Sequence, residues 1–265
     1  MKRRIPVLLI LVLAIVSCRN NKTDEITNTP VIPQPTVMNY QVLKILPHDT
    51  SSFTEGLFLM DGAFMESTGL NGKSYLRKNN FAGEAIQKVR LGDQYFGEGI
   101  AMIHNKIYQL TYKEHKVFVY DLNLKKLPEE FEWPYEGWGM TTDGTNLIIS
   151  TGGSNIYFVD PETFKIVRTL GVMNNNGYVD SLNELEYVDG YIYANVWYSN
   201  YINKINTKTG LVEARADLTD IFKRNNLFSE IDEGNVLNGI AYNPETKSFY
   251  VTGKNWARMF EVRFN

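Results

Sequence analysis

Glutamate recurs at one place in a repeated loop of this chain, and several glutamates brought to one site could move protons. Five short loops precede five apolar segments, and three of the loops place glutamate directly before glycine, at Glu55, Glu98 and Glu136. Carboxyl groups that share a concave site repel one another, which raises the pKa of at least one. Such a carboxyl takes up and returns a proton near neutral pH. The alternative is a structural role, with carboxylates bonded to backbone amides, as we expect for Glu184 and Glu186.

The apolar segments behind these loops form a repeat of two short strands joined by a tight turn. The five copies span residues 56–67, 99–111, 139–151, 184–197 and 239–253, so their first residues are 43, 40, 45 and 55 positions apart. A period of about 40–50 residues built from short strands is typical of a β-propeller. In a propeller the loops before the inner strands converge on one mouth, so the candidate carboxylates would lie together.

Each copy continues into further strands, as a four-stranded propeller blade requires. The last copy lacks an outermost strand after residues 258–264, whereas residues 40–46 stand alone before the first copy and have the character of an outer strand. We therefore predict an all-β, five-bladed propeller over residues 39–265, closed by the N-terminal strand pairing into the last blade. Residues 172–182 are a polar insert, and residues 218–232 are expected to form a short helix and loop.

The N-terminal segment resembles the signal peptide of a bacterial lipoprotein. A basic start precedes an apolar stretch at residues 6–16, which is shorter than the roughly 20 residues needed to span a bilayer. The stretch ends in Ile-Val-Ser-Cys, which looks like a lipobox and implies a lipid on Cys18. We expect residues 1–18 to be the signal segment, residues 19–38 a disordered tether, and the protein a lipid-anchored protein of the bacterial cell envelope, in the periplasm or on the outer membrane. An ordinary secretion signal with an incidental cysteine is the alternative.

Composition and cysteine and histidine content narrow the classes of function. The net charge is −3 and 22% of residues are charged, so no nucleic-acid partner is expected. Cys18 is the only cysteine, which leaves no disulfide. The histidines His48, His104 and His115 have no ligand spacing, so we expect no metal, no cofactor and no Ser-His-Asp triad. We expect a monomer that meets the membrane only through its lipid.

Ten short motifs follow one another in a characteristic order. They are FTEGL from Phe53, STG from Ser67, SYLR from Ser74, FGEG from Phe96, YQLT from Tyr108, EGWG from Glu136, LNELE from Leu182, ANVW from Ala194, VLNGIA from Val236 and VTGK from Val251. Together they resemble the plant and bacterial, papaya-type glutaminyl-peptide cyclotransferase family over nearly all of residues 40–264. The resemblance implies a five-bladed propeller and an enzyme that converts N-terminal glutamine of peptides and proteins to pyroglutamate, with release of ammonia and without a metal.

The resemblance also implies which residues form the site. The FGEG motif implies that Glu98 is the catalytic carboxylate, acting as general base and acid, with Asn183 and Lys254 as amide and amine donors. The implied aromatic walls are Phe53, Trp138 and Trp197. Two substrate-binding positions depart from the family pattern, because Tyr112 stands where Trp is frequent and Glu55 stands where Gln is common. Glu55 would add negative charge near Glu98 and raise its pKa further.

One alternative belongs to a different class of protein. A lipid-anchored propeller that binds a peptide or glycan without chemistry would fit the departures at Tyr112 and Glu55. A propeller lactonase or dehydrogenase would need a central Ca²⁺ or a quinone site, and no ligand set for either is apparent. Release of ammonia from a dipeptide that begins with glutamine distinguishes the enzyme from the binding protein.

Overall fold

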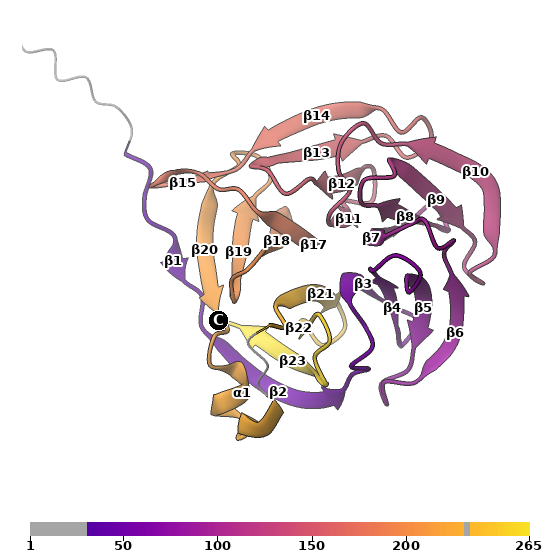
Figure 1. The fold of residues 1–265 in the computed structure, drawn as a ribbon. Coiled ribbons are helices and arrows are strands. Elements are labelled where there is room, and N and C mark those ends of the chain that lie inside the picture. Colours follow the sequence, from indigo (N-terminus) through magenta and orange to yellow (C-terminus); the bar gives the residue numbers. More distant parts are fainter. Residues whose placement is uncertain (1–30, 231–233) are drawn as a thin grey trace, which may run out of the picture. The chain divides into compact units, whose positions relative to one another are not determined.

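The five predicted blades are present in a computed structural model that describes residues 31–230 and 234–265. The described chain from Ile32 onward forms a ring of five antiparallel sheets around a central axis (Figure 1). Inner strands of neighbouring blades contact one another all the way round, so that β21 of the last blade meets β3 of the first. The prediction of a five-bladed propeller is confirmed.

In the first four blades the strands β3–β20 that form the blade follow chain order from the axis to the rim, and in the fifth blade the N-terminal strand β2 takes the outermost place. The first three blades consist of β3 (Thr54–Met60), β4 (Ala63–Thr68), β5 (Tyr75–Asn79) and β6 (Ala85–Arg90); β7 (Gly97–Ile103), β8 (Lys106–Thr111), β9 (Lys116–Tyr120) and β10 (Lys126–Glu132); and β11 (Met140–Thr142), β12 (Leu147–Ser150), β13 (Asn155–Val159) and β14 (Ile166–Gly171). The remaining blades consist of β17 (Leu182–Val188), β18 (Tyr191–Val196), β19 (Tyr201–Asn206) and β20 (Val212–Asp217); and β21 (Leu237–Asn243), β22 (Ser248–Gly253), β23 (Arg258–Phe264) and β2 (Tyr40–Pro47).

Turn residues of the inner hairpins explain why the strands reverse where they do. Asp61 and Gly62 have φ angles of 49° and 69°, and Asp189 and Gly190 have φ angles of 49° and 86°. Two successive residues in the left-handed region form the two-residue turn whose twist matches that of a β-hairpin. The Asp-Gly pairs in the repeat therefore fix both the register and the length of these hairpins.

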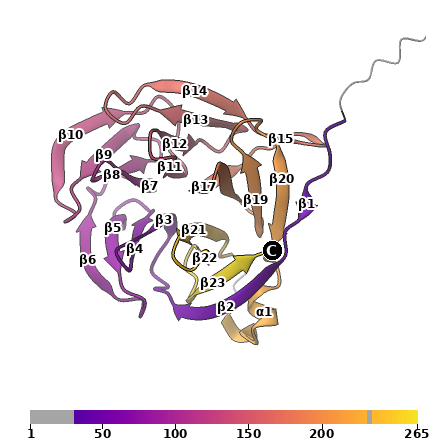
Figure 2. The ribbon, with the colours of Figure 1, turned by 180° about the vertical axis from the view of Figure 1, so that it is seen from behind.

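The ring closes at the strand that precedes the first repeat. β2 pairs antiparallel with β23, with Tyr40 opposite Phe264 and Pro47 opposite Arg258. In Figures 1 and 2 this indigo strand lies along the yellow C-terminal strand at the outer edge of the fifth blade. The predicted closure is confirmed, and it removes the exposed sheet edges that an open ring would leave.

A short strand lies within the last residues of the predicted tether. β1 (Thr36–Val37) pairs in parallel with β20, and Met38 is buried. The predicted signal segment 1–18, the lipidation site Cys18 and most of the tether 19–38 lie outside the described residues. None of the helices in the described ranges is long and apolar enough to cross a membrane.

Both predicted insertions have local structure of their own. The polar insert contains the small hairpin of β15 (Met173–Asn174) and β16 (Gly177–Tyr178), and the segment before the fifth blade contains α1 (Ile221–Arg224) and the short 3-10 helix η1 (Phe228–Glu230). The α1 helix is amphipathic, with Ile221 and Phe222 buried and two basic residues in its last turn. Phe222 packs edge to face against Trp256 and Phe260 of the fifth blade.

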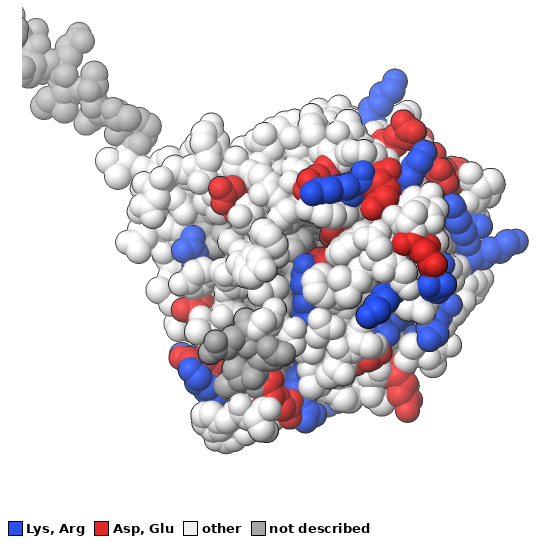
Figure 3. Space-filling model, in the orientation of Figure 1, with Lys and Arg blue, Asp and Glu red and all other residues white. Residues whose placement is uncertain are grey.

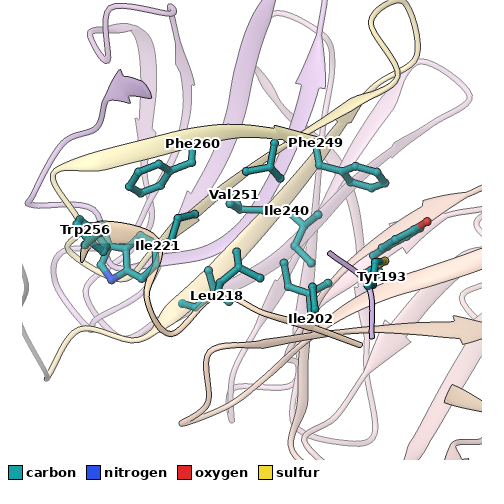
Figure 4. Packing of buried hydrophobic residues seen from close by; sticks show 14 of the residues in the cluster. Tyr193, Ile202, Leu218, Ile221, Ile240, Phe249, Val251, Trp256 and Phe260 are labelled. Carbon is teal, nitrogen blue, oxygen red and sulfur yellow. The ribbon is translucent and has the colours of Figure 1, made fainter. Parts of the chain in front are cut away.

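Apolar side chains pack between each pair of neighbouring blades. Five clusters of buried residues fill these interfaces in the described part of the chain. Between the fourth and fifth blades, Figure 4 shows Ile202, Leu218 and Ile240 in one cluster with Val251 and Phe260. Full burial of one such side chain contributes about 1.5–3 kcal/mol. The packed blades form a rigid frame for the loops at the mouth.

Candidate active site

Irregular strand pairing aims the candidate site residues toward the axis. Four of the five inner strands begin with a shift in register, and the shifts fall at Glu55 in β3, Glu98 in β7, Asn183 in β17 and Asn238 in β21. A shift of this kind leaves residues out of the ladder and redirects their side chains, as β-bulges near active sites do. The remaining blade, the third, places Trp138 at the axis from the loop immediately before its inner strand β11.

A cavity of about 260 Å³ opens at this end of the ring. All eight catalytic and substrate-binding residues predicted from the sequence line it, namely Phe53, Glu55, Glu98, Tyr112, Trp138, Asn183, Trp197 and Lys254. Figure 3 shows the hollow near the middle of the face, with acidic and basic surface inside it. Residues from all five blades therefore meet at one place.

An ion pair occupies one wall of the cavity. The Lys254 Nζ atom lies 2.7 Å from Glu55 Oε1, and Asn238 Nδ2 donates hydrogen bonds to Glu55 Oε2 at 3.1 Å and to the Thr54 carbonyl at 2.9 Å. The Lys254 ammonium also lies 4.5 Å from the centre of the Phe53 ring. Burial raises the pKa of Glu55, and the adjacent ammonium works against that rise. Both carboxyl oxygens of Glu55 are thus held by neighbours.

Glu98 is in a different situation although it shares the cavity. Its side chain is only 5% exposed, and its carboxyl group forms no hydrogen bond with another residue in the described ranges. Burial raises the pKa of Glu98 well above its ordinary value, and the Glu55 carboxyl raises it further. Lys254 acts in the opposite direction, while Glu114 and Glu136 add to the rise. Glu98 is therefore a carboxyl group that is free to exchange a proton with a bound molecule.

Aromatic rings form the rest of the wall. Trp138 and Trp197 meet edge to face, with ring centres 5.4 Å apart. The Phe96 ring meets Phe53 edge to face, with ring centres 6.1 Å apart, and lies tilted against Tyr112, with ring centres 5.7 Å apart. The hydroxyl-bearing ring of Tyr112 thus keeps the wall that a tryptophan would supply. Such rings hold an alkyl chain by contact while leaving its polar groups to the carboxyl and amide groups.

Two glycines make room for these rings. A Cβ atom on Gly69 would lie 2.3 Å from the Phe96 ring and 3.1 Å from Glu55 Cγ. Gly152 has a φ angle of 74°, and a Cβ atom there would lie 2.5 Å from the Trp138 ring. Larger residues at either position would displace the aromatic walls.

Asn183 has unused hydrogen-bonding capacity. Its backbone carbonyl accepts a hydrogen bond from Ser150 Oγ at 2.7 Å, which fixes the start of β17. The residue is 3% exposed, and its Oδ1 atom is buried without a hydrogen-bond partner among the described residues. A buried polar atom left unpaired is costly. A ligand with an amine or amide group would satisfy it.

Other buried acids near the axis are structural. The two carboxyl oxygens of Glu184 accept hydrogen bonds from the amides of Leu57 at 3.1 Å and Ile240 at 2.8 Å, so this residue ties three inner strands together. Glu186 accepts a hydrogen bond from the Tyr242 amide at 2.7 Å. Burial raises the pKa of Glu186 to about 8 and that of Glu184 well above its ordinary value. The expected backbone bonding of both residues is confirmed.

Four residues of the cavity wall were not among the predicted site residues, namely Phe96, Tyr198, Gly234 and Val236. The repeat carried a signal for Phe96, because it precedes Glu98 by two positions as Phe53 precedes Glu55. Val236 carried the same signal, because it precedes Asn238 by two positions, whereas Tyr198 and Gly234 lie outside the recurring positions of the repeat. Across the described ranges, no three His, Cys, Asp or Glu side chains are grouped so that they could hold a metal ion.

Comparison with known proteins gives consistent matches. A family model described as glutamine cyclotransferase matches residues 8–264. Glutaminyl-peptide cyclotransferase of Arabidopsis thaliana is 35% identical over 226 residues, which are 84% of this chain and 70% of that protein. The crystal structure of Myxococcus xanthus glutaminyl cyclase superposes with a TM-score of 0.80 at 32% identity, covering 88% of this chain and 99% of that one. The WD40 domain of Neurospora crassa Pan2, with a TM-score of 0.50 at 8% identity over 86% of this chain and 97% of that one, shares the fold alone.

Proposed function

The chain belongs to the glutamine cyclotransferase family, and we propose that Glu98 is the residue that moves the proton in its reaction. The protein is a glutaminyl-peptide cyclotransferase, which converts the N-terminal glutamine of peptides to pyroglutamate and releases ammonia. In this reaction the α-amine attacks the carboxamide carbon of its own side chain. A new C–N bond closes the ring, and the bond to the carboxamide nitrogen breaks.

Proton transfer accompanies both of these bond changes. The attacking amine carries a surplus proton once its nitrogen has bonded to carbon, and the departing nitrogen must gain one to leave as ammonia. An ionised Glu98 takes the proton from the ring nitrogen and gives it to the leaving nitrogen, so it ends in the state in which it began. The free α-amino group has a pKa of about 7.7–8.0, so a carboxyl with a raised pKa is better matched to it than an ordinary one.

Charge on oxygen develops while the tetrahedral intermediate exists. Asn183 and Lys254 line the cavity with groups that can donate to this oxygen. One well-placed donor of this kind contributes about 2.7–4 kcal/mol to the transition state. The ion pair with Glu55 and the contact with Phe53 hold the Lys254 ammonium in one position, so little reorganisation is needed when the charge appears.

The aromatic walls supply orientation. An extended glutamine side chain does not place its amine near its own carboxamide, so the reaction requires a folded conformer. The rings of Trp138, Trp197 and Phe53 enclose a space of about 260 Å³, which favours the compact shape. Holding reacting groups of one molecule in contact is a large source of rate enhancement. We propose that these groups suffice without a metal ion.

The observation that carries this proposal is the buried carboxyl of Glu98, which forms no hydrogen bond with another described residue and lies inside an aromatic cavity. The test is ammonia release by the full-length protein from glutaminyl-glycine, with glutamyl-glycine and alanyl-glycine as controls. We expect ammonia and a pyroglutamyl product from the first peptide alone. Release at the same rate from glutaminyl-glycine by a Glu98→Gln variant would contradict the assigned role.

We also propose that the protein is anchored in the bacterial cell envelope by a lipid on Cys18. The support is the basic start, the apolar stretch and the lipobox-like ending of residues 1–18. In a bacterial host, cyclase activity should sediment with membranes, and Cys18→Ala should move it to the soluble fraction. Equal distribution of the two proteins between the fractions would overturn the anchor.

A further inference from the structure

A second cavity, of about 310 Å³, lies beside the active-site cavity, between the loops of the fourth and fifth blades. We propose that this second cavity binds the residue that follows the N-terminal glutamine and favours an apolar or aromatic side chain there. The inference rests on the proposed function, because it concerns the remainder of the same substrate.

The two cavities share a wall. Tyr198 and Val236 line both of them. The Val236 carbonyl accepts a hydrogen bond from the Lys254 amide at 2.9 Å, which ties this wall to the active site. On the far side, Trp256 Nε1 donates to the Asn235 carbonyl at 3.0 Å. A peptide leaving the active-site cavity over this wall therefore enters the second cavity directly.

The volumes of the two cavities also fit different parts of the substrate. Pockets for small-molecule ligands measure roughly 300–1,000 Å³, and the active-site cavity, at about 260 Å³, lies below that range. It has room for the cyclising residue, whereas the next residue must lie outside it. The second cavity is large enough for one further side chain and is adjacent on the side of the shared wall.

Tyr198 marks the boundary between the cavities. Its ring lies 4.5 Å from that of Trp197, which continues the row that begins at Trp138. The Tyr198 side chain is 75% exposed, and its φ angle is 55°, a conformation that a bulky residue rarely adopts. Unusual backbone conformations of this kind concentrate at binding and catalytic sites. The exposed ring offers a flat surface on which the peptide group after glutamine can lie.

The floor of the second cavity is apolar and already packed. It includes Leu218, Ile221, Phe222 and Trp256, and Phe222 and Trp256 meet edge to face with ring centres 4.7 Å apart. Figure 4 shows Leu218, Ile221 and Trp256 as part of the packed cluster between the blades. An apolar side chain of the substrate would cover this floor and leave water.

The experiment compares three substrates of the full-length protein. Glutamine amide reaches only the active-site cavity, glutaminyl-glycine adds a peptide group, and glutaminyl-phenylalanine amide adds a ring. We expect kcat/KM for the phenylalanine peptide to exceed that for the glycine peptide about tenfold, as filling an apolar pocket does in other enzymes.

A variant tests where this preference arises. Thr219 is exposed at the second cavity, and its amide donates to Asp217 Oδ1 at 2.9 Å. Thr219→Trp should fill the cavity and lower the ratio of the phenylalanine to the glycine peptide to near one. Thr145 is exposed in the β11–β12 turn, with its amide donating to Asp143 Oδ1 at 2.9 Å. Thr145→Trp is therefore the matched control and should keep the wild-type ratio.

The outcomes separate the two proposals. Ammonia from all three substrates at equal kcat/KM would overturn the second-residue site while the cyclase function stands. A preference that survives Thr219→Trp unchanged would place the recognition elsewhere and also overturn it. Ammonia from none of the substrates would overturn the proposed function and the second-residue site with it.

Discussion

Glu98 and Glu66 are both buried carboxyl groups, but they lie in opposite electrostatic surroundings. Glu98 faces the active-site cavity and forms no hydrogen bond with another described residue. Glu66, on the neighbouring blade, accepts hydrogen bonds from Thr54 Oγ1 at 2.7 Å and Asn79 Nδ2 at 2.7 Å, and its Oε1 atom lies 3.0 Å from His48 Nε2. The Arg77 guanidinium lies 3.2 Å from its other oxygen.

These surroundings shift the two pKa values in opposite directions. Burial alone would raise the pKa of Glu66, but His48, Arg77 and the hydrogen bond from Thr54 hold it at about 2. Around Glu98, burial and the neighbouring carboxyl groups raise the pKa more than the Lys254 ammonium lowers it. A buried acid that is fully paired stays charged and holds the fold together. A buried acid that faces a cavity without partners can exchange its proton.

The largest effect should come from Glu98→Gln. Loss of a positioned acid and base lowers kcat by about 10²- to 10⁴-fold, whereas the amide fits the same space without leaving a charge unpaired. Steady-state ammonia release gives kcat, and thermal unfolding should show a melting temperature close to that of the wild type. Retention of more than about a tenth of the rate would show that another group carries the proton.

Glu66→Gln should have the opposite effect, lowering the stability of the fold while leaving kcat unchanged. It leaves His48 and Arg77 without their buried partner, and breaking a buried charge pair costs about 3–5 kcal/mol. Urea unfolding measures the loss, while the folded variant should keep its kcat. Glu129→Gln is the control, because the Glu129–Lys106 pair at 3.0 Å is at the surface and its loss should cost much less.

The stabilisation by Glu66 should also depend on pH. Its pKa in the folded protein is about 2, below the ordinary glutamate value of about 4.3. The stabilisation is therefore fully present above the ordinary value and is lost as the pH falls toward the folded value. The difference in stability between wild type and Glu66→Gln should shrink over that range, and a constant difference would contradict this account.

A smaller effect on activity is expected from substitution of Glu55 or Lys254, the charged neighbours of Glu98. Glu98 must be ionised to accept a proton, so kcat/KM should fall as the pH falls through its pKa. The Glu55 carboxyl raises that pKa and the Lys254 ammonium lowers it. Glu55→Gln should therefore move the acidic limb of the profile to lower pH, and Lys254→Met should move it to higher pH. Shifts in the same direction for both variants would refute the coupling.

No effect is expected from removal of metal ions. If Glu98, Asn183 and Lys254 suffice, dialysis against a strong chelator leaves kcat/KM unchanged. A mock-dialysed sample controls for losses during handling. Activity that disappears and returns with added zinc would show that proton transfer by Glu98 is not the whole mechanism.

The fold and eight of the residues that line the cavity could be predicted from the sequence, because hairpin turns such as Asp61-Gly62 repeat and the motifs keep their order. The partners of the buried acids could not be predicted in the same way. Glu55 and Lys254 are 199 positions apart and meet only because the ring closes. Glu66 is not part of any of the ten motifs, and its surroundings come from side chains of three separate segments. Pairing across blades depends on side-chain directions that a periodic pattern does not specify.

The Glu55–Lys254 ion pair also lies across the seam of the ring. Glu55 belongs to the first blade and Lys254 follows β22 of the last, where β2 and β23 join the two ends of the domain. A ribosome makes the first blade long before the last, so the nascent chain has Glu98 but lacks the lysine that completes its surroundings. With the role proposed for Lys254, catalysis begins only after the fifth blade has been synthesised and the ring has closed.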